Sequence, residues 1–306
     1  MSRLSSHFGR HSRRAFLQGS AAVGGALALS GRGAGRFGVS SVSAQELARE
    51  ETLYVGGFQW GPPTTFNPFT PTRAWPSNED FEHVFETVFA FNLYTGELEP
   101  LLGKDLQWLD PQTAVVTLQE GMKWNDGTPL TSADIVYTFE LPQRVDGLYY
   151  SDLWQFLTSA EATDERTVTL KLNPDQLNPG MVKRQLTQIH IVPKHIWETR
   201  ESGAEALIEI IDLEPVGSGP YKVLDASTER VALVRDDAYW GTAVFGTPVP
   251  RYIVHPIFDS NDVANLAFQR GEIDVSQTFL PQVWQLWEDK GIPAGTWYKE
   301  EPYHVP

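Results

Sequence analysis

The sequence contains no cysteine in its 306 residues. This absence excludes disulfide bonds, thiol catalysis, cysteine-ligated zinc and iron–sulfur clusters. It also excludes a lipid anchor on an N-terminal cysteine, so we do not expect a lipoprotein of that type. Long hydrophobic runs are missing as well. The apolar segment AAVGGALALSG at 21–31 is too short and too rich in glycine to span a membrane.

Basic residues are scarce in comparison with acidic ones. The chain has 24 Lys and Arg against 39 Asp and Glu, a formal net charge of −15. The first 44 residues hold six Arg and no acid, so the remainder has 18 basic and 39 acidic residues, a net charge of −21. Such a chain repels phosphate backbones and anionic lipids, and we expect no nucleic-acid partner. The acids favour a solubilising surface, although a local cluster could bind a cation or an amine.

Motifs of catalytic or cofactor sites are also missing. The sequence has no G-x-S-x-G, no H-E-x-x-H and no P-loop. A literal G-x-G-x-x-G at 33–38 follows no expected strand and begins no expected helix. Asp134 and Glu140 lie six residues apart and do not share a helix face, and His190 and His195 are poorly spaced for a metal. We therefore predict no enzyme, no catalytic residue, no cofactor and no metal; a secreted hydrolase is kept as an alternative.

The N-terminus has the three parts of an export signal. Arg13-Arg14 followed by Phe16-Leu17 resembles the twin-arginine motif. The apolar segment 21–31 and the small residues Val42-Ser43-Ala44 follow in the expected order. The alternative is a basic tail before a helix. We predict a signal peptide over 1–44, cleaved near Ala44, and a soluble periplasmic protein exported in folded form.

The remaining chain alternates between strand and helix patterns, which predicts a mixed α/β (α+β) fold. Helical spacing begins near Glu79 and continues to Phe89, recurs over 195–211, and recurs after the N-cap residue Ser260. A loop at 215–221 runs into a strand that should form a hairpin with 230–237. The other expected strands lie at 52–58, 113–120, 165–173 and 251–258.

The segment EGMKWNDGTPLTSADIVYTFE at 120–140 predicts a sharp strand–turn–helix corner. Asn125-Asp126-Gly127 forms a turn in which glycine supplies a positive φ. Thr131 is the expected N-cap, and Asp134, three residues later, completes a capping box. Leu130 and Ile135 can form a hydrophobic staple. No nucleophile is paired with a base here, so the corner is interpreted as architectural.

This corner resembles a block found in the extracellular solute-binding proteins of family 5, the peptide/nickel ABC-importer class. Ser132 and Ile135 are mild variants of that block. PVGSGPY at 215–221 resembles a second family element, with Ser218 in place of Thr. Further resemblances are RDDAYWG at 235–241, GEIDV at 271–275, FNPF at 66–69 and ETVFAFNLYTGELEP at 86–100.

The resemblance implies a periplasmic-binding-protein-like fold of type II. It places a first lobe at 45–258, with an accessory subdomain at about 86–195, and the incomplete start of a second lobe at 259–306. Family members are much longer than 306 residues. We therefore expect the sequence to be a fragment; a non-functional truncated remnant is the alternative.

By the same resemblance, we expect the extracytoplasmic substrate-binding component of an ABC importer. It would bind an oligopeptide, or an oligosaccharide such as a cello-oligosaccharide, between two lobes and deliver it to the membrane permease subunits. We expect it to be a monomer. The ten Trp, the segment at 58–76 and PKHIWE at 193–198 favour a sugar slightly over a peptide.

Candidate ligand-binding residues lie in the proline-rich loop after the first strand. Trp60 and Trp75 flank this loop, and Phe66 and Asn67 lie between them. An indole ring can stack on the apolar face of a sugar or of a side chain while its N–H donates a hydrogen bond. Packing within the loop is an equally good interpretation. Trp154 is a weaker candidate.

Overall fold

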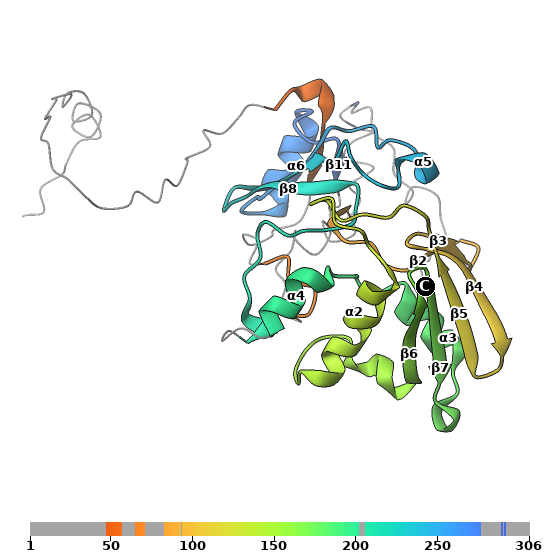
Figure 1. Ribbon diagram of the computed structural model, residues 1–306. Coiled ribbons are helices and arrows are strands. Elements are labelled where there is room, and N and C mark those ends of the chain that lie inside the picture. The colour runs from red at the N-terminus through yellow and green to blue at the C-terminus, as the bar shows by residue number, and fades with distance from the viewer. Residues whose placement is uncertain are drawn as a thin grey trace, which may run out of the picture. The chain divides into compact units, whose positions relative to one another are not determined.

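The computed structural model has three sheets in the part of the chain that it describes, and the one that contains β1 (Thr52–Gly56) and β8 (Tyr221–Ala226) draws its strands from both ends of that part (Figure 1). Among the residues it describes, no helix is both long and apolar enough to cross a membrane. The signal predicted over 1–44 lies outside these residues. The structure describes residues 47–56, 65–70, 83–92, 94–201 and 206–276, together with 289 and 291.

A four-stranded antiparallel sheet has the order β4-β5-β7-β6. Its inner strands alternate between buried and more exposed residues, as expected for a sheet with one face on a core. Ala114, Val116 and Leu118 of β5 lie on the buried face. The strands are β4 (Gly103–Asp110), β5 (Thr113–Leu118), β6 (Leu157–Asp164) and β7 (Thr167–Leu172).

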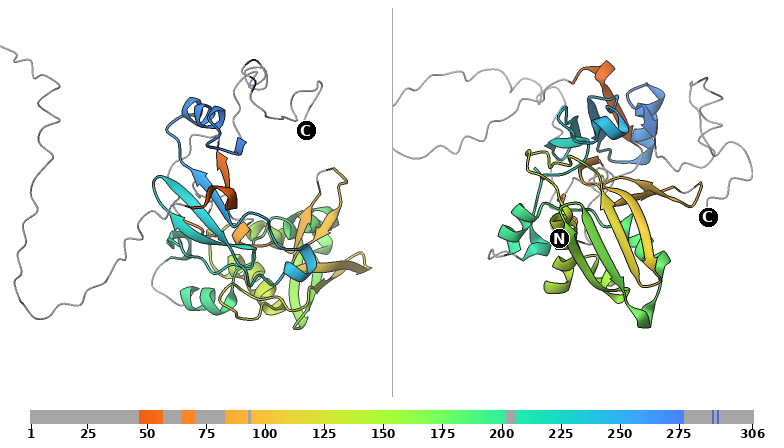
Figure 2. Two further views of the ribbon diagram at one scale, coloured as in Figure 1. Left: turned by 90° about the horizontal axis from the view of Figure 1, so that it is seen from above. Right: turned by 45° about the vertical axis from the view of Figure 1, so that its right-hand side comes forward.

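A short antiparallel ribbon, β2 (Phe89–Phe91) with β3 (Leu98–Pro100), lies beside β4 and is orange in Figure 2. It corrects the helix predicted from Glu79 to Phe89, of which only 83–84 is helical within the described residues. The backbone groups of this segment bond to distant partners instead of closing helical turns. The N–H of Glu86 donates to Ser218 Oγ at 3.1 Å, and the Val88 carbonyl accepts from Gly103.

Helix α2 (Ser132–Arg144) begins as the sequence predicts. Thr131 is its N-cap, and both hydrogen bonds of the capping box with Asp134 are present. Further along, the helix predicted over 195–211 is shorter. Helix α4 (Lys194–Glu201) is followed by the 3₁₀ turn η4 (Leu207–Glu209). The other helical elements are η1 (Arg49–Glu51), η2 (Ser151–Gln155), η3 (Pro174–Gln176) and α3 (Pro179–Leu186).

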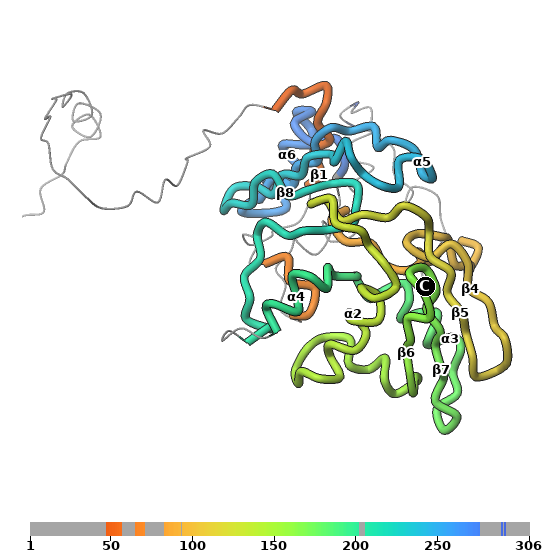
Figure 3. The backbone as a smooth tube through the Cα atoms, in the orientation of Figure 1, coloured from red at the N-terminus to blue at the C-terminus, as the bar shows by residue number. Residues whose placement is uncertain are grey.

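A five-stranded mixed sheet has the order β11-β1-β10-β9-β8. Strand β1 pairs in parallel with both β10 and β11, whereas β8, β9 and β10 are antiparallel neighbours. The predicted hairpin of β8 and β9 is confirmed. Figure 3 shows the chain path around β1, β8 and α6. The elements are β1 (Thr52–Gly56), β8 (Tyr221–Ala226), β9 (Arg230–Arg235), α5 (Thr242–Phe245), β10 (Tyr252–Pro256), α6 (Asn261–Gln269) and β11 (Val275–Ser276).

Residues after the lobe boundary predicted at 258 continue this mixed sheet. Ser260 caps α6 through its side chain, as the sequence predicts. The chain then turns at Gly271, where φ is +73°, and β11 pairs with the end of β1. Within the described residues, β11 thus joins the sheet of β1, and the lobe boundary at 258 stays a prediction.

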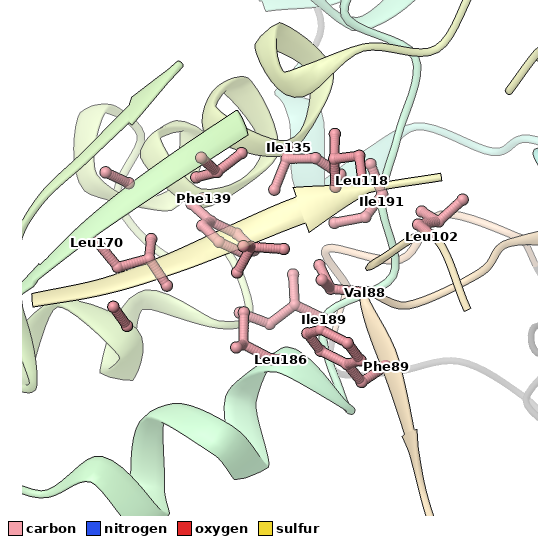
Figure 4. Close-up of a cluster of buried hydrophobic side chains, with 14 of the residues drawn as sticks. Val88, Phe89, Leu102, Leu118, Ile135, Phe139, Leu170, Leu186, Ile189 and Ile191 are labelled. Atoms are coloured by element: carbon pink, nitrogen blue, oxygen red, sulfur yellow. The ribbon is translucent and has the colours of Figure 1, made fainter. Parts of the chain in front are cut away.

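Two large hydrophobic clusters hold these sheets. In Figure 4, Ile135 and Phe139 of α2 and Leu186 of α3 gather near β5. The buried members of this cluster run from Val88 to Ile191, inside the accessory range of about 86–195 expected from the sequence. The second cluster joins side chains of β1, β8, β9 and β10 to residues of α2 and α4, among them Leu141 and Trp197.

Candidate functional site

An open groove with a volume of about 1840 Å³ lies along the β2–β3 ribbon, β4, η2 and α3. Aromatic rings supply much of its wall. Phe91 and Tyr149 are about half exposed, with 49% and 48% of their surface accessible. The groove is larger than the roughly 300–1,000 Å³ of ordinary small-molecule pockets, which favours an extended ligand. The aromatic side chains that line it are Phe85, Phe89, Phe91, Trp108, Tyr149, Tyr150 and Phe156.

Charged groups of both signs share this groove. Lys183 and Arg184 reach it from α3, and Asp152 lies on η2. All three are exposed, so they can exchange water for ligand at low cost. Within the described ranges, no three His, Cys, Asp or Glu side chains gather closely enough to hold a metal ion.

Tyr149 and Tyr150 form a paired aromatic surface on the groove wall, with ring centroids 4.6 Å apart. Tyr150 has φ +75° and is the one non-glycine with positive φ among the described residues. This conformation costs about 1 kcal/mol or more and requires compensating contacts. The Tyr150 hydroxyl lies 3.2 Å from His190 Nδ1, and its ring meets Phe69 edge-on at 6.3 Å.

Glu86 is one of the residues that line the groove, and it is 4% exposed. The Tyr239 hydroxyl donates to its Oε1 at 2.5 Å, and Trp240 Nε1 donates to its Oε2 at 3.0 Å. Burial raises the pKa of Glu86 to about 7, although hydrogen bonds from Tyr239, Trp240 and Ser218 oppose that rise. Residues from two sequence elements, 215–221 and 235–241, thus converge on one buried carboxyl group.

The glycines of the 215–221 loop allow it to approach the segment of Glu86 closely. A Cβ atom on Gly217 would lie 2.0 Å from the Val84 carbonyl oxygen, and one on Gly219 would lie 2.3 Å from that of His83. Neither position admits a side chain without backbone movement. These glycines therefore let the loop before β8 lie against the segment that carries Glu86, and this contact forms a junction between the two segments.

The strand–turn–helix corner completes this junction. The N–H of Asn125 donates to the Gly217 carbonyl at 2.9 Å. Asp134, the capping-box residue, also accepts from the N–H of Lys194 at 3.0 Å. Trp124 beside the turn is 2% exposed. These contacts agree with an architectural role for the corner.

The predicted ligand-binding residues do not line the groove where the structure describes them. Phe66 and Asn67 are fully buried, and Asn67 Nδ2 donates to the Leu207 carbonyl at 2.7 Å. Trp154 is half-buried, and its Nε1 donates to the Phe139 carbonyl at 2.7 Å. Their ligand contact stays a prediction, as does that of Trp60 and Trp75, which lie outside the described residues.

Sequence reasoning missed the groove residues. The pair Tyr149-Tyr150 follows Gly147 in a polar stretch, and two adjacent tyrosines in such a stretch were the available signal. Phe91 lies in the family-like segment 86–100, which the sequence analysis did not connect with a ligand. No local pattern marks Glu86, because its partners Tyr239 and Trp240 are about 150 residues distant.

Comparison with known families identifies the class of protein. The family model described as bacterial extracellular solute-binding proteins, family 5 Middle, matches residues 97–305. The chain therefore belongs to the extracellular solute-binding proteins of family 5. This membership confirms the resemblance that the motifs indicated.

Individual relatives agree with this family. The chain is 34% identical over 202 residues to the probable peptide-binding protein YejA of Agrobacterium fabrum; the match covers 63% of this chain and 32% of that protein. It is 27% identical over 223 residues to a putative ABC transporter peptide-binding protein of Brucella ovis, covering 71% and 40%. The chain thus spans less than half the length of these relatives.

Solved structures confirm the periplasmic-binding-protein-like fold. A periplasmic oligopeptide-binding protein of Thermotoga maritima, crystallised with mannohexaose, is 36% identical with a TM-score of 0.76. That match covers 85% of this chain and 47% of the other. The oligopeptide-binding protein AppA of Bacillus subtilis, in complex with a nonapeptide, shares the fold at 23% identity and a TM-score of 0.59.

Proposed function

We propose that this chain is part of the extracytoplasmic substrate-binding component of an ABC importer, and that it binds an oligopeptide or oligosaccharide. The observation that carries the proposal is the wide groove with exposed aromatic rings and charges of both signs. Such a wall offers apolar faces to the repeating units of an oligomer and hydrogen-bonding groups to its polar edges. Family membership supports the same function.

We further propose that the described residues belong mainly to one lobe and that ligand is held between it and a second lobe. Closure of two lobes around a ligand is a hinge movement that buries the groove. The bound form is then recognised by the permease subunits, and the protein works as a monomer without turnover. Size-exclusion chromatography with light scattering tests the monomer.

We also propose export through the twin-arginine signal over 1–44, with cleavage near Ala44 and a periplasmic location. The support is the order of Arg13-Arg14, the apolar segment and the small residues in the sequence. Replacement of Arg13 and Arg14 by Lys should retain the protein in the cytoplasm. Intact mass of the exported product tests the cleavage site.

Ligand binding is tested by calorimetry on the natural gene product that contains this chain. Defined hexasaccharides (mannohexaose and cellohexaose) and a pool of oligopeptides are the two ligand classes. Saturable binding of one class without products on chromatography supports a receptor. Release of shorter sugars or peptides would establish a hydrolase, and binding of neither class would contradict the proposal.

A further inference from the structure

The Tyr149–Tyr150 pair combines features that none of the other exposed aromatic residues in the described chain shows together. The ring centroids are 4.6 Å apart, and the ring planes are inclined by 50°. The Tyr149 ring is half exposed, and the backbone of Tyr150 has a positive φ, which is rare for a side chain of this size. Strained conformations of this kind persist where the surrounding structure fixes them, and they concentrate at ligand sites.

Tyr150 is fixed from several directions. Its ring packs against both large hydrophobic clusters, and its hydroxyl meets His190. The N–H of Tyr149 donates to the Phe69 carbonyl at 2.9 Å, which fixes the backbone that carries the second ring. Tyr149 is therefore presented on a rigid support, and little conformational entropy is lost when a ligand covers it.

Planar polar groups lie directly after this aromatic pair. Gln155 Nε2 donates to Asp152 Oδ1 at 2.9 Å, and both side chains are exposed in the groove. The remaining carboxylate oxygen and amide oxygen can accept hydrogen bonds from ligand hydroxyl groups. An aromatic face beside such acceptors matches a pyranose ring, which has an apolar face of C–H groups and a rim of hydroxyls.

The backbone of η2, beneath the aromatic pair, forms hydrogen bonds within its own turns. Within η2 and its flanks, the N–H of Leu153 donates to Tyr150 and that of Phe156 donates to Leu153. Addition of a peptide strand requires a sheet edge, and in this groove the edges belong to β2, β3 and β4 and not to η2. Resting on the proposed receptor function, we infer that Tyr149, supported by Tyr150 and flanked by Asp152 and Gln155, forms a pyranose-stacking subsite for an oligosaccharide.

The test is calorimetric titration of mannohexaose and cellohexaose into the natural gene product and its variants. Tyr149→Ala should weaken binding of the bound hexasaccharide about tenfold, because the stacked face is lost. Tyr149→Phe should retain binding, since the ring is kept. Asp152→Ala with Gln155→Ala should weaken it severalfold. Tyr94→Ala removes a ring that is 94% exposed and does not line the groove, and should change nothing.

The outcomes separate the subsite from the receptor function. If the natural protein binds a hexasaccharide and Tyr149→Ala binds it equally well, the subsite is wrong and the receptor function stands. Binding of oligopeptides alone also overturns the sugar subsite and leaves the receptor function. Binding of neither class overturns both. Circular dichroism of each variant checks folding, and Tyr149→Phe decides the case if Tyr149→Ala does not fold.

Discussion

The two sheets differ in how far apart their strands lie along the chain. All strands of the antiparallel sheet come from residues 103–172 and pair mainly with neighbours in sequence. In the mixed sheet, Thr52 pairs with Tyr252, and Val55 pairs with Val275. The first sheet closes short loops, whereas the second must bring distant segments together at a larger cost in chain entropy. The comparison indicates that the antiparallel sheet is specified locally, whereas the mixed sheet depends on segments that are about 200 residues apart in the sequence.

The largest effect is expected where the two regions meet. Gly217→Ala places a Cβ atom 2.0 Å from the Val84 carbonyl oxygen, so the loop must move and lose its bond from Asn125. We expect unfolding free energy to fall by about 4 kcal/mol or more. Gly180→Ala is the control, because its Cβ meets nothing closer than 3.4 Å; in helix α3 it should stabilise by about 0.5–1 kcal/mol. Urea denaturation measures both, and equal effects would contradict the close approach.

Two Leu→Ala substitutions, each of which creates a cavity in one of the two hydrophobic clusters, test whether the clusters unfold independently. Leu170 of β7 and Leu233 of β9 are both fully buried. Leu170→Ala and Leu233→Ala should each cost about 3–4 kcal/mol. Hydrogen exchange should speed up in β5, β6 and β7 for the first variant, and in β1, β8 and β10 for the second. Uniform acceleration across both sheets in either variant would show a single cooperative unit.

Glu86 makes the stability of the folded protein depend on pH. Because its pKa is raised from 4.5 to about 7 in the folded protein, the folded state binds a proton that the unfolded state releases between these values. The stabilisation is fully present below pH 4.5 and is lost as pH rises to about 7. In the Glu86→Gln variant, the fall in unfolding free energy across this pH range should be smaller by about 3 kcal/mol. Urea midpoints across that window compare the variant with the wild type, and parallel curves would contradict the raised pKa.

The smallest effect concerns the cap of α2. Thr131→Ala removes the side chain that accepts from the N–H of Ala133, and should cost about 1 kcal/mol. Thr131→Ser is the matched control and should retain most of the stability. Thermal unfolding measures both variants. A loss of several kcal/mol would mean that Thr131 contributes to the junction and not only to the helix.

Local signals in the sequence predicted local structure well. The capping box of α2, the hairpin of β8 and β9 and the cap at Ser260 all depend on residues close in sequence. The helix predicted up to Phe89 failed although its apolar spacing was helical. Hydrogen bonds to Ser218 and Gly103, far along the chain, override that spacing.

The groove escaped prediction for the same reason. Loop tryptophans were selected because loops carry ligand contacts, yet Trp154 donates its N–H to a backbone carbonyl and packs on a core. The placement of Tyr149 in the groove depends on the Phe69 carbonyl, which accepts from its N–H, and on His190, which meets the hydroxyl of Tyr150. Such placement depends on contacts between segments that no short window of sequence contains.

The pairing of β1 has a consequence for the growing chain on the ribosome. β1 is synthesised first, but its partners β10 and β11 are synthesised last among the described strands. The antiparallel sheet can form while β1 still presents open edges, a state in which strands associate with other chains or with chaperones. The mixed sheet therefore cannot be complete until translation has passed Ser276.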